Sequence, residues 1–336
     1  MSERICILGA GSWGLTLACL LAKKQHKVKL WESDAKQAEI LERTRQFKFL
    51  PGLVMPDDLH FSSEIKSALE GAQVIVYAVP SQVVGSVSEK ISPYLKKKGT
   101  VIVIATKGVD ALSSLRMSEI VCSGKNSDLI EKTCVLSGPT IAIEVMRKIP
   151  TAAVVAAKNK NVAERVQQLL MTPYFRLYTS DDVAGVEIGG SIKNIIAIAA
   201  GIGDGLGLGT NAKAALMTRG VVEIVRLGAR MGANPDTFHG LSGIGDLITT
   251  CISKHSRNRS FGEKIGQGMS TQDALDEIQM VVEGVETTKG VMGLAKKMDI
   301  DMPITAEVYG VLFEGKSPRK VVGDLMNRQA KPEVET

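Results

Sequence analysis

The first residues of the chain place a glycine-rich turn between a short apolar run and a helical pattern. Residues 5–8 are apolar, and the letters GAGSWG that follow put glycine at Gly9, Gly11 and Gly14. A second apolar run covers residues 28–31. In a strand, turn, helix and strand of this kind, the first glycine permits the tight turn, the second lets the backbone approach a pyrophosphate, and the third lets helix and strand pack closely. The segment therefore predicts a dinucleotide-binding loop whose phosphates meet a helix N-terminus.

The first half of the chain continues this alternation of short apolar runs and helical patterns. Val/Ile-rich runs occur at residues 5–8, 28–31, 74–79, 101–105, 134–136 and 152–156, and helical patterns at residues 15–24, 36–45 and 162–170. Continuous apolar strands separated by helices are typical of a parallel sheet that is covered on both faces. We expect an α/β fold with a doubly wound, Rossmann-like sheet.

The second half has no such runs after about residue 181, and helical patterns replace them. These patterns lie at residues 211–231, 273–278, 287–298, 306–313 and 319–327. At 336 residues the chain is longer than one hydrophobic core usually supports. We therefore predict two domains: residues 1–185 form the Rossmann-like NAD(P)-binding domain, and residues 186–336 form an all-α substrate and catalytic domain.

Composition narrows the possible ligands and compartment. The excess of 41 basic over 36 acidic residues gives a net charge of +5, which suits a small anionic molecule better than nucleic acid. The five cysteines are widely spaced and form no zinc-binding pattern, so we expect no metal and a reducing cytoplasm. The N-terminus has no signal-peptide pattern, and we expect no apolar run to approach the ~18 residues of a membrane span. The expected protein is soluble, cytoplasmic and not inserted in a membrane.

Lys193 lies in an unusually apolar setting. Between residues 183 and 203 the only other charged residue is Glu187. Burial disfavours the ammonium form, so a lysine placed there can exchange a proton near neutral pH and act as a general acid or base. The alternative is a lysine that extends from its helix to water and does no chemistry.

Polar groups follow several of the expected strands, where doubly wound sheets bind their ligands. Glu32 and Asp34 follow the second strand, where a carboxylate can accept hydrogen bonds from the adenosine ribose and favour NAD over NADP. The alternative is that both acids face solvent and Asp34 caps the next helix. Lys107 follows the strand at residues 101–105, and the letters SGPT follow the strand at residues 134–136. A cation at this edge suits an anionic substrate.

The helical half supplies a second group of polar residues. Asp246 lies in an otherwise uncharged run, and Lys193 is its natural partner. The letters HSRNR follow at residues 255–259, where Arg257 offers a planar guanidinium that can bind a phosphate through two hydrogen bonds. The alternative is that residues 255–259 form a solvated basic turn that binds no ligand.

Together these motifs resemble the bacterial-type NAD(P)-dependent sn-glycerol-3-phosphate dehydrogenases over essentially the whole chain. The shared letters are GAGSWG, VPS, ATKG, SGPT, GGSIKN, NAKAALMTRG, GIGDL, SRNR and VVEG, in this order. The glycine-rich loop is common to many dehydrogenases, whereas the combination of GGSIKN and SRNR is specific. The resemblance implies a 6-phosphogluconate dehydrogenase-like arrangement of the two domains and a homodimer.

The resemblance also implies a reaction and a set of site residues. Lys193 is the expected proton donor or acceptor in the interconversion of dihydroxyacetone phosphate and sn-glycerol 3-phosphate with NAD(P)H, a step that supplies phospholipid synthesis. The expected catalytic residues are Lys193, Asp246 and Lys107. The expected substrate site comprises Lys107, Gly138, Thr140, Lys193, Asp246, Thr250, Ser256, Arg257 and Asn258. The expected cofactor site comprises Gly9, Gly11, Ser12, Trp13, Gly14, Glu32, Ser33, Lys107, Ala142, Arg257, Val281 and Glu283.

Two alternatives remain from the sequence. A β-hydroxyacid dehydrogenase has the same domain order and also uses a lysine on a helix after the nucleotide-binding domain. A non-catalytic sensor of the NAD(P) redox state can use the same fold. Ser33 stands where NADP-using relatives often carry histidine or arginine, so the preference between the two cofactors stays open.

Overall fold

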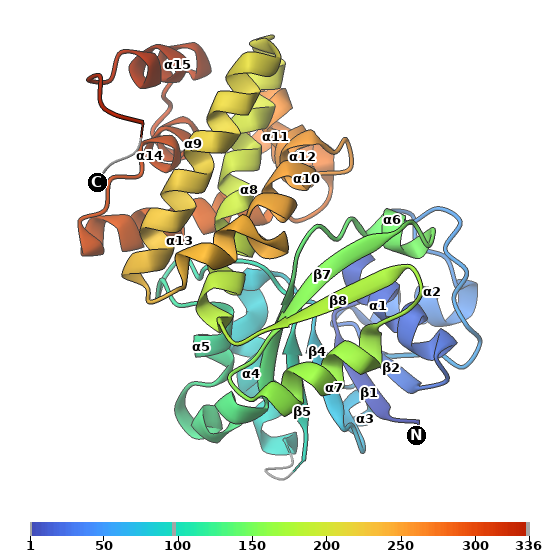
Figure 1. The fold of residues 1–336 in the computed structure, drawn as a ribbon. Helices are drawn as coiled ribbons and strands as arrows, with labels where there is room; N and C mark the ends of the chain where they lie inside the picture. Colours follow the sequence, from blue (N-terminus) through green and yellow to red (C-terminus); the bar gives the residue numbers. More distant parts are fainter. Residues whose placement is uncertain (1, 96–98, 334–336) are drawn as a thin grey trace.

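The computed structural model describes residues 2–95 and 99–333, and it contains one eight-stranded sheet followed by a helical part (Figure 1). The strands are β1 (Arg4–Leu8), β2 (Lys27–Trp31), β3 (His60–Ser62), β4 (Val74–Tyr77), β5 (Val101–Ile104), β6 (Thr133–Ser137), β7 (Thr151–Ala156) and β8 (Phe175–Ser180). The predicted α/β fold class, a Rossmann-like sheet followed by helices, is confirmed.

The strand order is β3-β2-β1-β4-β5-β6-β7-β8. The first six strands are parallel, but β7 runs antiparallel to β6, and β8 pairs with β7 in parallel. The expectation of a wholly parallel sheet is therefore wrong at this edge. The prediction also missed β3, which has three residues, and β8, where buried Phe175 and Leu177 alternate with exposed Arg176 and Tyr178. An alternating edge strand lacks the continuous apolar run that was used to find the others.

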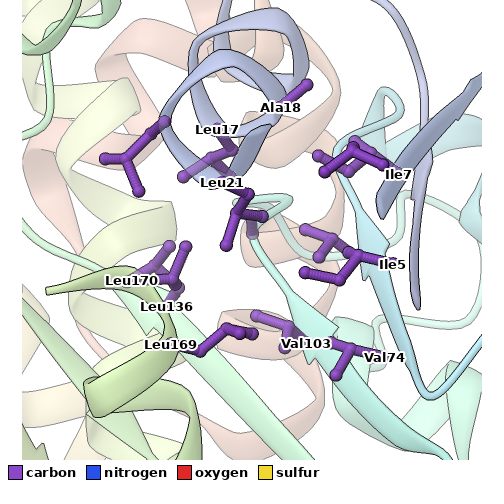
Figure 2. Packing of buried hydrophobic residues seen from close by; sticks show 14 of the residues in the cluster. Ile5, Ile7, Leu17, Ala18, Leu21, Val74, Val103, Leu136, Leu169 and Leu170 are labelled. Carbon is purple, nitrogen blue, oxygen red and sulfur yellow. The ribbon is translucent and has the colours of Figure 1, made fainter. Parts of the chain in front are cut away.

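Helices cover both faces of the sheet. Cores on one face contain residues from α1 (Ser12–Lys23), α2 (Ala35–Thr44), α6 (Ala142–Met146) and α7 (Lys160–Leu170); those on the other contain residues from α3 (Ile65–Leu69), α4 (Val84–Ile91) and α5 (Met117–Val121). Successive strand residues point to opposite faces: Ile5 and Ile7 belong to the first core, and Cys6 and Leu8 to the second. Figure 2 shows Ile5 and Ile7 of β1 to the right of Leu17 and Leu21 of α1, in the same core.

The glycine-rich turn between β1 and α1 has the geometry that its letters predict. Gly9 has a φ of +104°, a conformation that L side chains rarely adopt. A Cβ atom on Gly14 would lie 2.0 Å from the carbonyl oxygen of Gly9, so only glycine lets α1 start this close to the turn. The turn lies between β2 and β4, at the point where the strand order reverses, which is where open sheets of this kind bind ligands.

The helical part is arranged around α8 (Val183–Gly205), which contacts most of the helices near it (Figure 1). Its other helices are α9 (Gly209–Arg230), α10 (Asp246–Ile252), α11 (Arg257–Gly266), α12 (Thr271–Ile278), α13 (Glu283–Met298), α14 (Pro303–Phe313) and α15 (Pro318–Met326). One turn of π-helix, Leu241–Gly245, precedes α10. The five predicted helical patterns of this half all correspond to helices.

Helix α8 corrects one expectation. Its 23 residues are long and apolar enough to cross a membrane, so the expectation that no apolar run reaches this length is wrong. The protein itself buries 83% of the apolar window, which makes α8 the core helix of the helical part.

Helix α8 also joins the two halves. The sheet ends at Ser180 and α8 begins at Val183, so the division proposed between residues 185 and 186 falls in its first turn. Val186 belongs to a core on the sheet, whereas Ile192 and Ile195 belong to the core of the helical part. A single helix therefore carries side chains that are fixed by both halves.

The backbones of α8 and α11 touch, and this contact generates a stability prediction. A Cβ on Gly201 would lie 2.0 Å from the carbonyl oxygen of Arg259, and one on Gly262 would lie 2.0 Å from that of Ile198. We expect Gly201→Ala to destabilise the protein by about 3 kcal/mol because the two helices must separate. Gly323→Ala is the matched control: this helical glycine has no atom within 4 Å of the added Cβ, and alanine should stabilise by up to about 1 kcal/mol. Urea unfolding measures both changes, and equal unfolding midpoints for the two variants would contradict the packing argument.

Candidate active site

A cleft of about 1240 Å³ lies between the carboxyl ends of the central strands and the helices α10 to α13. Most of the predicted site residues line it: Gly9, Gly11, Ser12, Trp13, Glu32, Ser33, Lys107, Thr140, Ala142, Lys193, Thr250, Ser256, Arg257, Asn258, Val281 and Glu283. The glycine-rich turn, the lysine of α8 and the HSRNR segment are far apart in sequence, yet they meet here.

The glycine-rich end of the cleft has room and donors for a dinucleotide. The space beyond Gly11 is open, since no atom lies within 4 Å of an added Cβ. The N-terminus of α1 begins at Ser12, so its first backbone N–H groups lie at the cleft, where a phosphate is stabilised. The indole Nε1 of Trp13 is buried and has no hydrogen-bond partner among the described residues, although it is a donor that ordinarily finds one. These residues fit a bound dinucleotide.

The two acids after β2 have different surroundings. Glu32 Oε2 accepts a hydrogen bond from the backbone N–H of Ala10 at 3.3 Å, and its Oε1 accepts one from that of Asp34 at 3.1 Å. Asp34 caps α2 by accepting from Lys36 N and Gln37 N at 2.9 and 3.2 Å. The capping interpretation is therefore correct for Asp34, whereas Glu32 places a carboxylate beside the glycine-rich turn.

Three charged side chains meet beside the cleft, where Lys107 and Lys193 line it and Asp246 lies behind them. Lys193 Nζ donates to Asp246 Oδ1 at 2.5 Å, and Lys107 Nζ donates to Asp246 Oδ2 at 2.7 Å. The expected pairing of Lys193 with Asp246 is present, and Asp246 also bridges to Lys107. Lys193 donates further to Thr250 Oγ1 at 2.8 Å. Lys193 and Asp246 are 6% and 1% exposed, so the cluster is held out of bulk water.

Burial lowers the pKa of Lys193 to about 8 from the ordinary value of 10.5. The carboxylate of Asp246 opposes this shift, and the positive charge of Lys107 adds to it. An amine whose pKa lies near neutral pH can both release and take up a proton at low cost. Lys193 therefore has the chemistry of a general acid and base, and it does not extend to bulk solvent.

Two groups from the strand ends hold Lys107 in place. Its Nζ also donates to the carbonyl oxygen of Gly138 at 2.9 Å and to Thr140 Oγ1 at 3.4 Å. Gly138 has a φ of +133°, and a Cβ there would lie 2.9 Å from Ala153 Cα of β7. The SGPT letters therefore form a turn that orients Lys107.

The N-terminus of α11 faces the cleft through the HSRNR segment. Ser256 caps α11, its Oγ accepting from Arg259 N at 3.2 Å, and Arg257 Nη1 donates to the carbonyl oxygen of Val281 at 2.7 Å. Arg257 is exposed, so its other N–H groups are accessible to a ligand. A helix N-terminus beside a guanidinium is suited to an anion such as a phosphate.

The amide of Asn258 is largely engaged within the protein. Asn258 Nδ2 donates to Asn194 Oδ1 at 2.9 Å, and Asn258 Oδ1 accepts from Gly284 N at 2.9 Å. These bonds fix the orientation of the amide, and one N–H of its Nδ2 is left for a ligand. Asn194 follows the lysine of GGSIKN, and the sequence argument did not single it out.

Glu283 connects the two walls of the cleft. It lies at the start of α13, and its carboxylate accepts from Ser81 Oγ at 2.5 Å and from Ser81 N at 3.3 Å. Burial raises the pKa of Glu283 above its ordinary range, and the bonds from Ser81 oppose that rise. Ser81 was noted only as part of the VPS letters after β4, because a serine after a proline is also ordinary turn chemistry.

Some residues lie elsewhere than expected. Gly14, Gly138 and Asp246 support the cleft from behind and do not line it. Arg259 of the HSRNR segment is paired with Asp204 at 2.7 Å and with Glu263 at 3.3 Å, so it joins helices. Phe47 and Phe49 line the cleft although the sequence argument did not name them. Their segment follows α2 without a recognisable motif.

Comparison with known proteins gives one family. Models of the NAD-dependent glycerol-3-phosphate dehydrogenase N-terminus and C-terminus match residues 4–163 and 182–323. The chain is 48% identical over 336 residues to the glycerol-3-phosphate dehydrogenase, named as using NAD(P)+, of Pelotomaculum thermopropionicum, which covers 100% of this chain and 96% of that protein. A protein of the same name from Prosthecochloris aestuarii is 49% identical over 334 residues, which is 98% of this chain and 99% of that one. The crystal structure of glycerol-3-phosphate dehydrogenase from Coxiella burnetii has a TM-score of 0.91 and 38% identity, and covers 97% of this chain and 99% of that one.

The charge cluster predicts opposite shifts in the pKa of Lys193 when Asp246 or Lys107 loses its charge. Asp246→Asn removes a negative charge beside Lys193 and should lower the pKa of Lys193 below about 8, whereas Lys107→Gln removes a positive charge and should raise it. The pKa can be followed through the Cε chemical shift of ¹³C-labelled lysine in NMR spectra, with the signal assigned by its loss in Lys193→Ala. A change in the same direction for both variants would contradict the electrostatic account.

Proposed function

Because the chain belongs to the family of NAD-dependent glycerol-3-phosphate dehydrogenases, we propose that its cleft interconverts dihydroxyacetone phosphate and sn-glycerol 3-phosphate with NAD(P)H. The observation that carries this proposal is that Lys193 shares one cleft with the glycine-rich turn and with the N-terminus of α11. A dinucleotide site, a proton donor and an anion site are the three parts that this reaction requires. The family membership favours this oxidoreductase over the β-hydroxyacid dehydrogenase and the non-catalytic sensor.

We assign the proton transfer to Lys193. The bound cofactor supplies the hydride for C2 in reduction and accepts it in oxidation. The ammonium of Lys193 gives its proton to the C2 oxygen of dihydroxyacetone phosphate, and the neutral amine takes the proton back from the C2 hydroxyl in oxidation. Asp246 and Thr250 hold the amine at 2.5 and 2.8 Å, so its direction is set before the substrate binds.

Lys107 supplies the second positive charge of the substrate site. It shares Asp246 with Lys193, so two cations face the oxygen on which negative charge develops. Such charges are effective in a site that excludes water, because they need no rearrangement during the reaction. Gly138 and Thr140 keep Lys107 in this position through the bonds to its ammonium group.

The phosphate of the substrate belongs at the N-terminus of α11 in this proposal. Arg257 provides the guanidinium, Ser256 begins the helix whose free amides face the cleft, and Asn258 has one N–H left to donate. Binding of the phosphate then holds C2 in line with Lys193 and the cofactor. This alignment raises the rate of the chemical step, although the phosphate does not itself react.

We assign the cofactor to the residues of the glycine-rich end and the opposite wall. Gly9, Gly11, Ser12, Trp13 and Gly14 hold the pyrophosphate and its neighbours, and Glu32 and Ser33 face the adenosine ribose. Ala142, Lys107, Arg257, Val281 and Glu283 complete the path toward Lys193. A homodimer in the cytoplasm that supplies glycerol 3-phosphate for phospholipid synthesis is the setting that the family suggests for this activity.

The assay that tests the proposal follows NADH oxidation with dihydroxyacetone phosphate. Lys193→Ala should lower kcat by on the order of 10² or more, the usual scale for a general acid. Because the pKa of Lys193 is about 8, the ammonium acid is lost as the pH rises through this value. Reduction should therefore fall above pH 8, and oxidation of glycerol 3-phosphate should rise over the same range. Near-normal turnover of Lys193→Ala would assign the proton to another group.

The carboxylate of Glu32 predicts a preference for NADH. Its charge beside the ribose site should repel the 2′-phosphate of NADPH, and Glu32→Gln should raise kcat/KM for NADPH relative to NADH by at least about tenfold, or about 1.4 kcal/mol. Asp34→Asn is the control, because Asp34 caps α2 and is exposed. A wild-type enzyme that prefers NADPH strongly would remove this role from Glu32.

A further inference from the structure

Glu187 is a buried carboxylate that the reaction described above does not use. It lies on α8 six residues before Lys193 and is 6% exposed. Its oxygens accept from Arg116 Nη1 at 2.7 Å, from Ser118 N at 2.8 Å and from Ser118 Oγ at 2.5 Å. Burial raises the pKa of Glu187, and Arg116 opposes this rise most strongly. Breaking the contacts of a buried carboxylate costs free energy because the charge is left without partners. Glu187 therefore fixes the positions of Arg116 and Ser118.

The partners of Glu187 lie at the end of the segment that begins with Lys107. Residues 107–116 follow β5 and close on themselves, since Val109 and Arg116 form an isolated antiparallel bridge. The carboxylate of Asp110 accepts from Ser113 N at 2.7 Å, which stiffens the tip of this loop. Arg116 therefore pairs with Val109, which lies only two positions after Lys107. A contact that fixes Arg116 also restrains Lys107.

Helix α8 and the loop at residues 107–116 are thus joined twice. One connection runs from Lys193 through Asp246 to Lys107, and the other runs from Glu187 to Arg116 and Ser118. The second connection involves no residue that lines the cleft. We infer that Glu187 is a positioning residue for the dehydrogenase reaction, which holds the loop against α8 so that Lys107 stays beside Lys193 and Asp246.

The need for such a residue follows from the charges in the cluster. Two ammonium groups share one carboxylate, so Lys107 and Lys193 repel each other across Asp246. Gly138 and Thr140 hold only the ammonium group of Lys107, whereas Glu187 holds the loop that carries this lysine. A release of Lys107 raises the pKa of Lys193, because Lys107 contributes to lowering it and Asp246 alone raises it. The thiol of Cys251 also lies near Lys193, and it stays neutral because burial raises its pKa to about 12.

The test compares two buried glutamates. Glu187→Gln keeps the shape of the side chain and removes the charge that pairs with Arg116. Its matched control is Glu223→Gln, because Glu223 on α9 is 2% exposed, accepts from Thr305 N at 3.1 Å and lines no part of the cleft. We expect both variants to lose thermal stability. Only Glu187→Gln should raise the pKa of Lys193, by about one unit, in the same lysine NMR titration.

The kinetic readout separates positioning from general damage. In Glu187→Gln, the fall of the reduction rate with pH should move to higher pH, and kcat should drop by about three- to tenfold because the acid is weakened, while KM for NADH stays unchanged. The inference rests on the proposed function for kcat alone, because the titration of Lys193 needs no substrate. A shift in the pKa with no dehydrogenase activity would overturn the proposed reaction and leave the positioning of Lys107 supported.

A double variant and a milder one complete the test. In Lys107→Gln, adding Glu187→Gln should move the pKa of Lys193 no further, because the group that Glu187 holds in place is gone. An equal shift with and without Lys107 overturns the inference, as does a Glu187→Gln variant that loses only stability. Ser118→Ala removes one of the bonds to Glu187 and should show a smaller shift of the same sign if Glu187→Gln does not fold. An unchanged pKa in Ser118→Ala combined with an unfolded Glu187→Gln counts against the inference.

Discussion

The carboxylate of Asp246, held between two lysines, is the interaction on which the arrangement of the active site depends. Lys107 comes from the end of β5, Lys193 from α8 and Asp246 from the first turn of α10, so the cluster joins the sheet to the helical part. An ammonium group out of water is expensive unless a carboxylate and further hydrogen-bond acceptors surround it. The cluster meets this condition through Thr250, Thr140 and the carbonyl oxygen of Gly138. Its net positive charge suits the negative charge that develops on the C2 oxygen in the proposed reaction.

Helix α8 makes this cluster possible because it is shared between the halves. Small residues let other backbones approach it: Gly201 faces the carbonyl oxygen of Arg259, and Gly189 faces that of Ser242. The same helix carries Glu187 toward the loop at residues 107–116 and Lys193 toward Asp246. Helix α8 is apolar almost throughout, and its three charged residues each meet a partner on a different neighbouring element: Glu187 meets Arg116, Lys193 meets Asp246, and Asp204 meets Arg259.

Much of the fold was predictable because short-range sequence patterns specify most of its strands and helices. The Val/Ile runs gave six strands, and the glycine spacing placed the turn between β1 and α1. The antiparallel direction of β7 and the existence of β8 were not predictable in the same way. Strand direction depends on the connection between strands, and β8 has Arg176 and Tyr178 on its exposed face, so its pattern is weaker than that of a buried strand.

The sequence by itself determined the residue types of the candidate site: a glycine turn for a dinucleotide, a lysine in an apolar helix, and an arginine within the letters HSRNR. It also suggested the pairing of Lys193 with Asp246, since isolated charges in apolar segments need partners. Only the tertiary structure decided that Lys107 shares this carboxylate, that Arg259 pairs with Asp204 rather than a ligand, and that Glu187 faces Arg116. The physical reason is that a charge interacts through distance and burial, and both are set by how elements far apart in sequence pack together.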